Sequence, residues 1–217
     1  MKMWVVFEKR GALKHIGHLD LMRAMQRALR RSGLPVKYSQ GYNPHILLNF
    51  AAPLSVGFEG LREVMEVPLA GPCGEQAFKD SLNQALPPLL RVLEARLVED
   101  TQGAPMALLG AAIYHIQPLA HFETLRDHLA GFLALPSVVT QRKSKKGMVD
   151  IDLRPLIYNL LPREHGFEAV LALREAGTCK PELLMQQFAA FAGVDMPEYQ
   201  VTRTQLLTEA LAPLEQA

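Results

Sequence analysis

Residues 14–45 read KHIGHLDLMRAMQRALRRSGLPVKYSQGYNPH, and the interpretation of the whole chain depends on this stretch. Its first half repeats apolar residues at helical spacing, with Leu21, Met25 and Ala28 at i, i+4 and i+7. Gly33 and Pro35 are typical of the end of a helix. The stretch therefore predicts, in order, a helix from about His18 to Ser32, a strand at Val36–Ser39 and a turn-rich loop at Gln40–His45.

The face of this helix opposite its apolar residues is basic. Four arginines recur there at three- and four-residue spacing, with Asp20 as the acidic residue among them; they are Arg23, Arg27, Arg30 and Arg31. Arginine forms a two-pronged contact that suits phosphate and carboxylate groups, so the stripe predicts an anion-binding face. The alternative is an ordinary solvated face, since exposed ion pairs contribute on the order of half a kcal/mol.

The charge distribution strengthens the first interpretation. The net charge is only +1, but residues 1–50 carry nine Lys and Arg against two acidic residues, and residues 136–180 carry eight against five. The blocks between and after them are acidic, so the surface is polarised and nucleic acid is a candidate partner. No apolar run of about 18 residues and no secretory leader is visible, which predicts a cytoplasmic protein without a membrane span.

The hydrophobic pattern predicts an α+β fold. The order β-α-β-β-α-β occurs twice, which is the ferredoxin-like arrangement. We therefore expect two tandem ferredoxin-like units with antiparallel sheets: an N-terminal domain at 1–100, a linker at 101–105 and a C-terminal domain at 106–217. The expected strands are Met3–Phe7, Val36–Ser39, His45–Ala52, Arg62–Leu69, Leu90–Val98, Ala107–Ile116, Val138–Arg142, Met148–Leu153, Phe167–Arg174 and Tyr199–Leu206. The further expected helices are Glu75–Ala85, His121–Leu133 and Pro181–Ala192, with a helical turn within Asp152–Leu160.

Three segments of the opening stretch carry a family resemblance: HLDLMR at 18–23, RALRRSGLP at 27–35 and YSQGYNPH at 38–45. They resemble a bacterial family of unknown function, usually called radical-SAM-linked, whose members are fused to or encoded beside radical S-adenosylmethionine proteins. Family members more often have serine where this chain has Gly17, and a second proline where it has Ile46. The resemblance implies a companion of a radical enzyme. Cys73 and Cys179 alone cannot hold an iron–sulfur cluster, and we expect no cofactor in this chain.

Three residues are candidates for chemistry. His18 and Asp20 begin the predicted helix and His45 ends the loop, so two imidazoles and a carboxylate could serve as general acid or base. The alternative is structural: His18 caps the helix, Asp20 pairs with Arg23, and His45 satisfies backbone groups in the turn. No third ligand at metal spacing is visible, so we predict no metal site.

Further candidates for anion or RNA binding accompany the arginines. Tyr38 and Tyr42 could stack on bases, or else serve core packing and the turn. A second basic element is the predicted turn that contains Lys143, Lys145 and Lys146, although such turns also serve solubility.

These observations leave three hypotheses. The favoured one is a non-catalytic module that holds RNA or another anionic partner for a radical S-adenosylmethionine enzyme. The second is a metal-independent RNA-processing endonuclease that uses His18 or His45. The third is a protein–protein adaptor whose basic face docks on an acidic surface.

Overall fold

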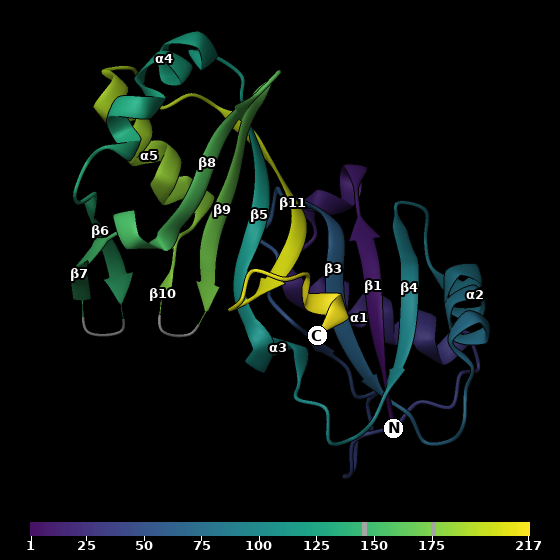
Figure 1. Ribbon diagram of the computed structural model, residues 1–217. Coiled ribbons are helices and arrows are strands. Elements are labelled where there is room, and N and C mark those ends of the chain that lie inside the picture. Colours follow the sequence, from purple (N-terminus) through teal and green to yellow (C-terminus); the bar gives the residue numbers. More distant parts are fainter. Residues whose placement is uncertain (145–146, 175–176) are drawn as a thin grey trace. The chain divides into compact units, whose positions relative to one another are not determined.

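The computed structural model of the protein describes residues 1–144, 147–174 and 177–217, and Figure 1 shows its elements. The fold is mixed α+β, with a large, mostly antiparallel sheet and, in the described residues, five α-helices. The chain divides into two compact units: unit 1 comprises Met1–Leu109 and Arg203–Ala217, and unit 2 comprises Gly110–Thr202. The folding domains predicted from the sequence, 1–100 and 106–217, remain a prediction.

Unit 1 contains the helix predicted from the opening stretch. Its central strand, β1, pairs antiparallel with β3 on one side and with β4 on the other, and β2 pairs with β3. The elements are β1 (Lys2–Lys9), η1 (Gly11–His15), α1 (His18–Arg31), β2 (Asn49–Phe50), β3 (Glu59–Pro68), α2 (Glu75–Ala85), β4 (Leu90–Val98), α3 (Pro105–Leu108) and η3 (Leu214–Gln216).

The core of unit 1 lies between one face of this sheet and the two longer helices. Alternate residues of β1 point into it, because successive side chains of a strand face opposite sides. The apolar stripe of α1 and two residues of α2 close the core from the helix side (Figure 1). Fully buried members are Met3, Val5, Phe7, Met25, Ala28, Met65, Val67, Phe78, Leu82 and Val92.

A buried ion pair lies beside this core. Arg203 donates from Nε and Nη2 to the two carboxylate oxygens of Glu63, at 2.8 and 2.6 Å, and it also donates to the carbonyls of Ala52 and Pro53. The two side chains are 2% and 4% exposed. Lys9 is also buried near this pair. Burial lowers the pKa of Lys9, and this effect outweighs the nearby Glu63 carboxylate, which raises it.

Unit 2 is built around β9, which pairs antiparallel with β5, β8 and β10, and its core is rich in phenylalanine rings. A separate two-stranded ladder joins β6 to β7. The elements are β5 (Leu109–Pro118), α4 (Phe122–Leu133), β6 (Val139–Ser144), β7 (Gly147–Asp152), η2 (Arg154–Leu156), β8 (Ile157–Arg163), β9 (Gly166–Arg174), β10 (Gly177–Thr178), α5 (Pro181–Ala192) and β11 (Tyr199–Thr208), whose residues from Arg203 on belong to unit 1.

Several predicted elements have the predicted bounds, and others differ. α2, β4 and α5 are confirmed to the residue, and α1 and α4 to within one residue. The strand predicted at Val36–Ser39 is instead two isolated bridges, Val36 to Leu69 and Tyr38 to Ile46. Turn residues on both sides keep this segment too short for a ladder. No helix of the described residues is long and apolar enough to cross a membrane.

Candidate nucleic-acid interface

The four arginines of α1 do not all have the same surroundings. An α-helix advances 100° per residue, so Arg23, Arg27 and Arg30 lie within an arc of about 60° on the solvent side. Arg31 lies on the flank that meets α2, where its Nη2 donates to the carbonyl of Ala85 at 2.5 Å. Three of the four predicted arginines therefore share one exposed face, and the fourth joins two helices.

The three arginines that share a face have little to neutralise them. Arg23 makes a long contact of 3.4 Å with Asp20, and both side chains are about two-thirds exposed. Arg27 and Arg30 pair with no carboxylate among the residues that the structure describes. Water and salt screen such charges in the free protein, so they are available to a polyanion. We call Arg23, Arg27 and Arg30 the arginine face.

The loop that follows α1 lies beside this face. Gln26 lies about 40° from Arg30 around the helix axis. Its Nε2 donates to the carbonyl of Ile46 at 2.9 Å. Ile46 in turn bridges Tyr38. Ile46, and through it Tyr38, are therefore held beside the flank that carries Gln26, while Tyr42 lies further out on the exposed loop.

The loop itself is closed by three hydrogen bonds between its two ends. The backbone N–H of Ser39 donates to the carbonyl of His45 at 2.8 Å, and the backbone N–H of His45 donates to Oγ of Ser39 at 3.1 Å. Oγ of Ser39 lies 2.9 Å from Nδ1 of His45. This contact engages Nδ1, so Nε2 is the ring nitrogen of His45 that does not face Ser39. Ser39 thus orients His45, a role that its place at the start of the loop could have suggested.

The candidate catalytic residues lie at different points along α1. The ring of His18 meets the ring of Phe50 edge-on, with centroids 5.3 Å apart, whereas His45 adjoins Ile46, which contacts Gln26. Gln26 comes eight residues after His18, or about 12 Å along the helix axis. The 45–50 segment thus runs beside α1, with His45 next to its middle and His18 at its start. Asp20 is exposed and bonds Arg23.

The second basic element is only partly described. Lys143 lies in β6, opposite Met148 in the ladder with β7. Lys145 and Lys146 are outside the described residues. Within the described part of the chain, no group of three or more His, Cys, Asp or Glu residues could hold a metal ion.

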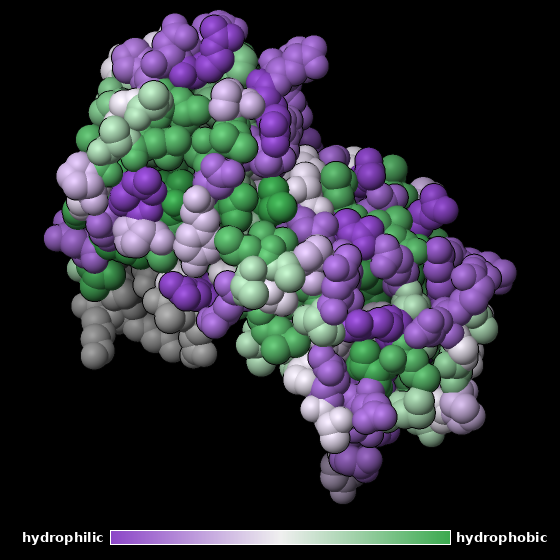
Figure 2. Space-filling model, viewed as in Figure 1, coloured by the Kyte–Doolittle hydropathy of each residue, from purple (hydrophilic) through white to green (hydrophobic). Residues whose placement is uncertain are grey.

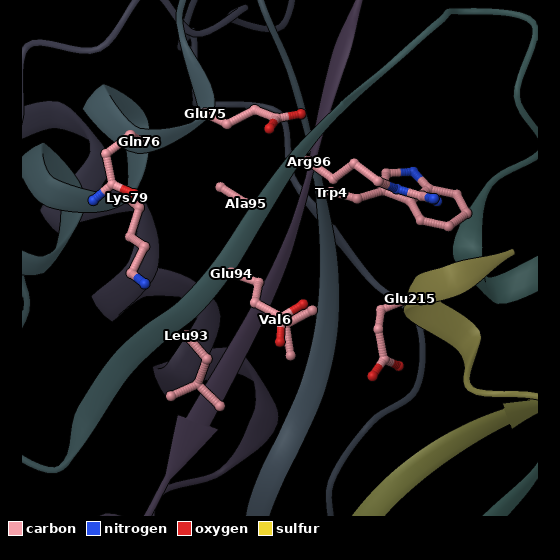
Figure 3. A pocket seen from close by; sticks show the side chains of 10 residues that line it. All are labelled: Trp4, Val6, Glu75, Gln76, Lys79, Leu93, Glu94, Ala95, Arg96 and Glu215. Carbon is pink, nitrogen blue, oxygen red and sulfur yellow. The ribbon is translucent and has the colours of Figure 1, made fainter.

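The other face of the unit 1 sheet carries a different arrangement. A cavity of about 420 Å³ lies there at the edge of β4, and Figure 3 shows its lining residues. Its carboxylates are engaged, since Glu75 accepts from the backbone N–H of Leu97, and Glu94 and Glu215 both pair with Arg62. Hydrophilic residues gather over β4 and α2 in this view (Figure 2). The carboxylates of the cavity are therefore already held by groups of the protein itself, which leaves the arginine face as the stronger candidate site.

Fold and surface together define a mixed α+β protein with an exposed cationic helix face and no membrane-spanning helix in its described part. Residues 2–183 match DUF2344, a family described as uncharacterized proteins conserved in bacteria, and the chain belongs to this family. No curated protein matches the sequence.

Proposed function

We propose that the protein is a non-catalytic module that binds RNA through the arginine face of α1. The observation that supports this proposal is the exposure of three arginines on one arc with a single, loosely paired carboxylate among them. A protein that neutralises phosphates with arginines releases counterions from the nucleic acid, and its affinity then falls steeply with salt.

The test is binding of a fluorescent structured RNA, such as tRNA, over a salt series. The wild type is compared with Arg23→Ala/Arg27→Ala/Arg30→Ala and with a control of equal charge loss, Arg91→Ala/Arg126→Ala/Arg163→Ala, whose arginines are exposed elsewhere. The face variant should lower the slope of log affinity against log salt by about two to three units, and the control should change it by less than one. Circular dichroism checks that both variants fold. Equal slopes for the three proteins, or no binding, would reject RNA and leave the adaptor hypothesis.

The Ser39–His45 contact favours a second candidate function, metal-independent RNA cleavage. It engages Nδ1 of His45 and leaves Nε2 of this exposed ring for proton transfer, and the next residue, Ile46, contacts Gln26 on the helix that carries the arginine face. In this case the wild type cleaves the bound RNA with EDTA present, and His45→Ala abolishes cleavage without weakening binding. Measuring cleavage by His18→Ala tells whether the other candidate histidine also takes part in the reaction. Intact RNA after prolonged incubation would leave the binding function alone.

We further propose that the partner served in the cytoplasm is a radical S-adenosylmethionine protein. The support is the resemblance of residues 18–45 to a family found fused to or encoded beside such proteins. Co-purification with a radical S-adenosylmethionine protein is the test, and an RNase treatment tells whether RNA bridges the two. Recovery of the chain alone, with and without RNA, would reject this partner.

We also propose a ferredoxin-like topology for both units. In unit 1 the order β1-α1-β2-β3-α2-β4, with β1 between β3 and β4, supports it. In unit 2 the order β5-α4-β8-β9-α5-β11, with β9 between β5 and β8, supports it once the β6–β7 hairpin is treated as an insertion. An experimental structure that gave a different strand order in either unit would reject the proposal.

A further inference from the structure

Exposed apolar side chains occur on α1 and on the segment that follows it, and phosphate binding does not require them. Leu19 lies about 40° from Arg23 on the helix wheel, on the same side as Gln26, and it is 63% exposed. Tyr38 is 43% exposed, and Tyr42 is completely exposed at the tip of the loop. A site built only for phosphates needs cations and donors, so these side chains indicate contact with something less polar.

Tyr42 is exposed but is carried on a closed loop. The hydrogen bonds between Ser39 and His45 fix both ends of the segment, and Pro44 restricts the backbone between them. Leaving a tyrosine ring wholly in water forgoes the burial that aromatic rings usually gain in a folded protein. A ring presented in this way, on the loop that follows the helix with the arginine face, is suited to stacking on a planar partner.

The bases inside a duplex cannot offer that partner. Away from the two ends of a double helix each base face is covered by its neighbours, and side chains meet only base edges, sugars and phosphates. An unpaired nucleotide presents its face, and its phosphates can lie on adjacent arginines at the same time.

We propose that the RNA held by the arginine face is unpaired where it meets the Ser39–His45 loop, and that Tyr42 stacks on one of its bases. This inference rests on the proposed function and narrows it from RNA in general to single-stranded segments such as loops, bulges and overhangs. Arg23, Arg27 and Arg30 supply the charge, and the loop supplies the preference for an exposed base.

The first experiment compares a short single-stranded RNA with a duplex of the same total charge whose two terminal base pairs are covered by non-nucleotide end caps. The wild type should bind the single strand more tightly. Tyr42→Ala should weaken single-strand binding about tenfold and leave duplex binding unchanged, whereas Tyr42→Phe should keep the wild-type affinity because it keeps the ring. Tyr158→Ala is the matched control, since Tyr158 is a partly exposed tyrosine on β8 in unit 2.

The second experiment detects stacking directly. The chain has one tryptophan, Trp4, and it is 2% exposed, so Tyr42→Trp adds an indole whose surroundings differ sharply from those of Trp4. Fluorescence of this variant should be quenched by the single strand and unaffected by the duplex. A single strand with an abasic site at the stacked position should restore the fluorescence.

The outcomes separate this inference from the function on which it rests. If Tyr42→Ala weakens binding to the duplex and the single strand equally, or not at all, while the arginine-face variant still loses affinity, the proposed function stands and the preference for unpaired RNA is overturned. If the arginine-face variant binds both probes as the wild type does, the proposed function fails first. Quenching that requires both the base and the introduced indole supports the whole argument.

Discussion

Replacing Arg203 by methionine should destabilise unit 1 by about 3–5 kcal/mol, because it leaves the Glu63 carboxylate buried without its ion-pair partner. The structure supports a value in this range. The pair is 2% and 4% exposed, both guanidinium–carboxylate contacts are shorter than 3 Å, and the carbonyls of Ala52 and Pro53 lose a donor as well. Methionine keeps most of the side-chain volume, so the cost reports the charge and not a cavity.

Removing both charges should cost less than removing one. In Arg203→Met/Glu63→Met both charges of the pair are removed together, so the carboxylate that would lose its partner is no longer there. The double variant should therefore be more stable than Arg203→Met. Arg23→Met is the control, because Arg23 and Asp20 are each about two-thirds exposed, and an exposed pair contributes at most about 1 kcal/mol.

Urea unfolding followed by the fluorescence of Trp4 measures these effects in the relevant unit, since Trp4 is the one tryptophan and lies buried in β1. The reasoning would be refuted if Arg203→Met lowered the free energy of unfolding by less than about 1 kcal/mol. It would also be refuted if the losses measured for Arg203→Met and Glu63→Met alone simply added in the double variant.

Three further predictions concern other positions. Burial lowers the pKa of Lys9 in the folded protein, so between that lowered pKa and about 10.4 the unfolded chain binds more protons than the folded one. The free energy of unfolding should therefore rise with pH over this window. Urea titrations at several pH values should show this rise for the wild type and a flatter one for Lys9→Met. Gly166→Ala should destabilise unit 2 by about 1–3 kcal/mol, since its Cβ would lie 2.3 Å from the carbonyl oxygen of Ile116, whereas Gly74→Ala, with open space around it, should cost less than about 1 kcal/mol in thermal unfolding. Gly17→Ser should stabilise α1 by a few tenths of a kcal/mol, measured as a small rise in Tm, because Gly17 caps the helix without a side-chain hydrogen bond.

Elements with a strong periodic pattern and clear end signals were predictable from the sequence. α1 has its apolar stripe and a glycine after its end, α2 is followed by Pro87, and α5 begins with Pro181, where proline is best tolerated. β8 and β10 were missed. β8 contains Pro162 and follows a helical turn, and β10 is two residues long, so neither shows an alternation that marks a strand.

The sequence predicted which arginines belong to the candidate site, but not which of them lie together in the structure. The spacing of the arginines placed all four on one side of α1, yet nothing local shows that Arg31 would meet the end of α2, 54 residues further along the chain. The pairing of Arg203 with Glu63 spans 140 residues and was likewise invisible. Such contacts depend on how elements pack, and the sequence pattern of either element alone does not contain them.

The arginine face lowers the stability of α1, and the packing of the helix does not explain why it is there. Arg23 and Arg27 are four residues apart, and like charges at this spacing destabilise a helix by about 0.2–0.5 kcal/mol per pair. α1 needs none of these charges for its packing, because its buried residues are Leu21, Met25, Ala28 and Leu29. Replacing the three face arginines should therefore leave the stability of unit 1 unchanged or raised while RNA affinity falls. Loss of binding without loss of stability distinguishes a surface kept for a partner from one kept for the fold.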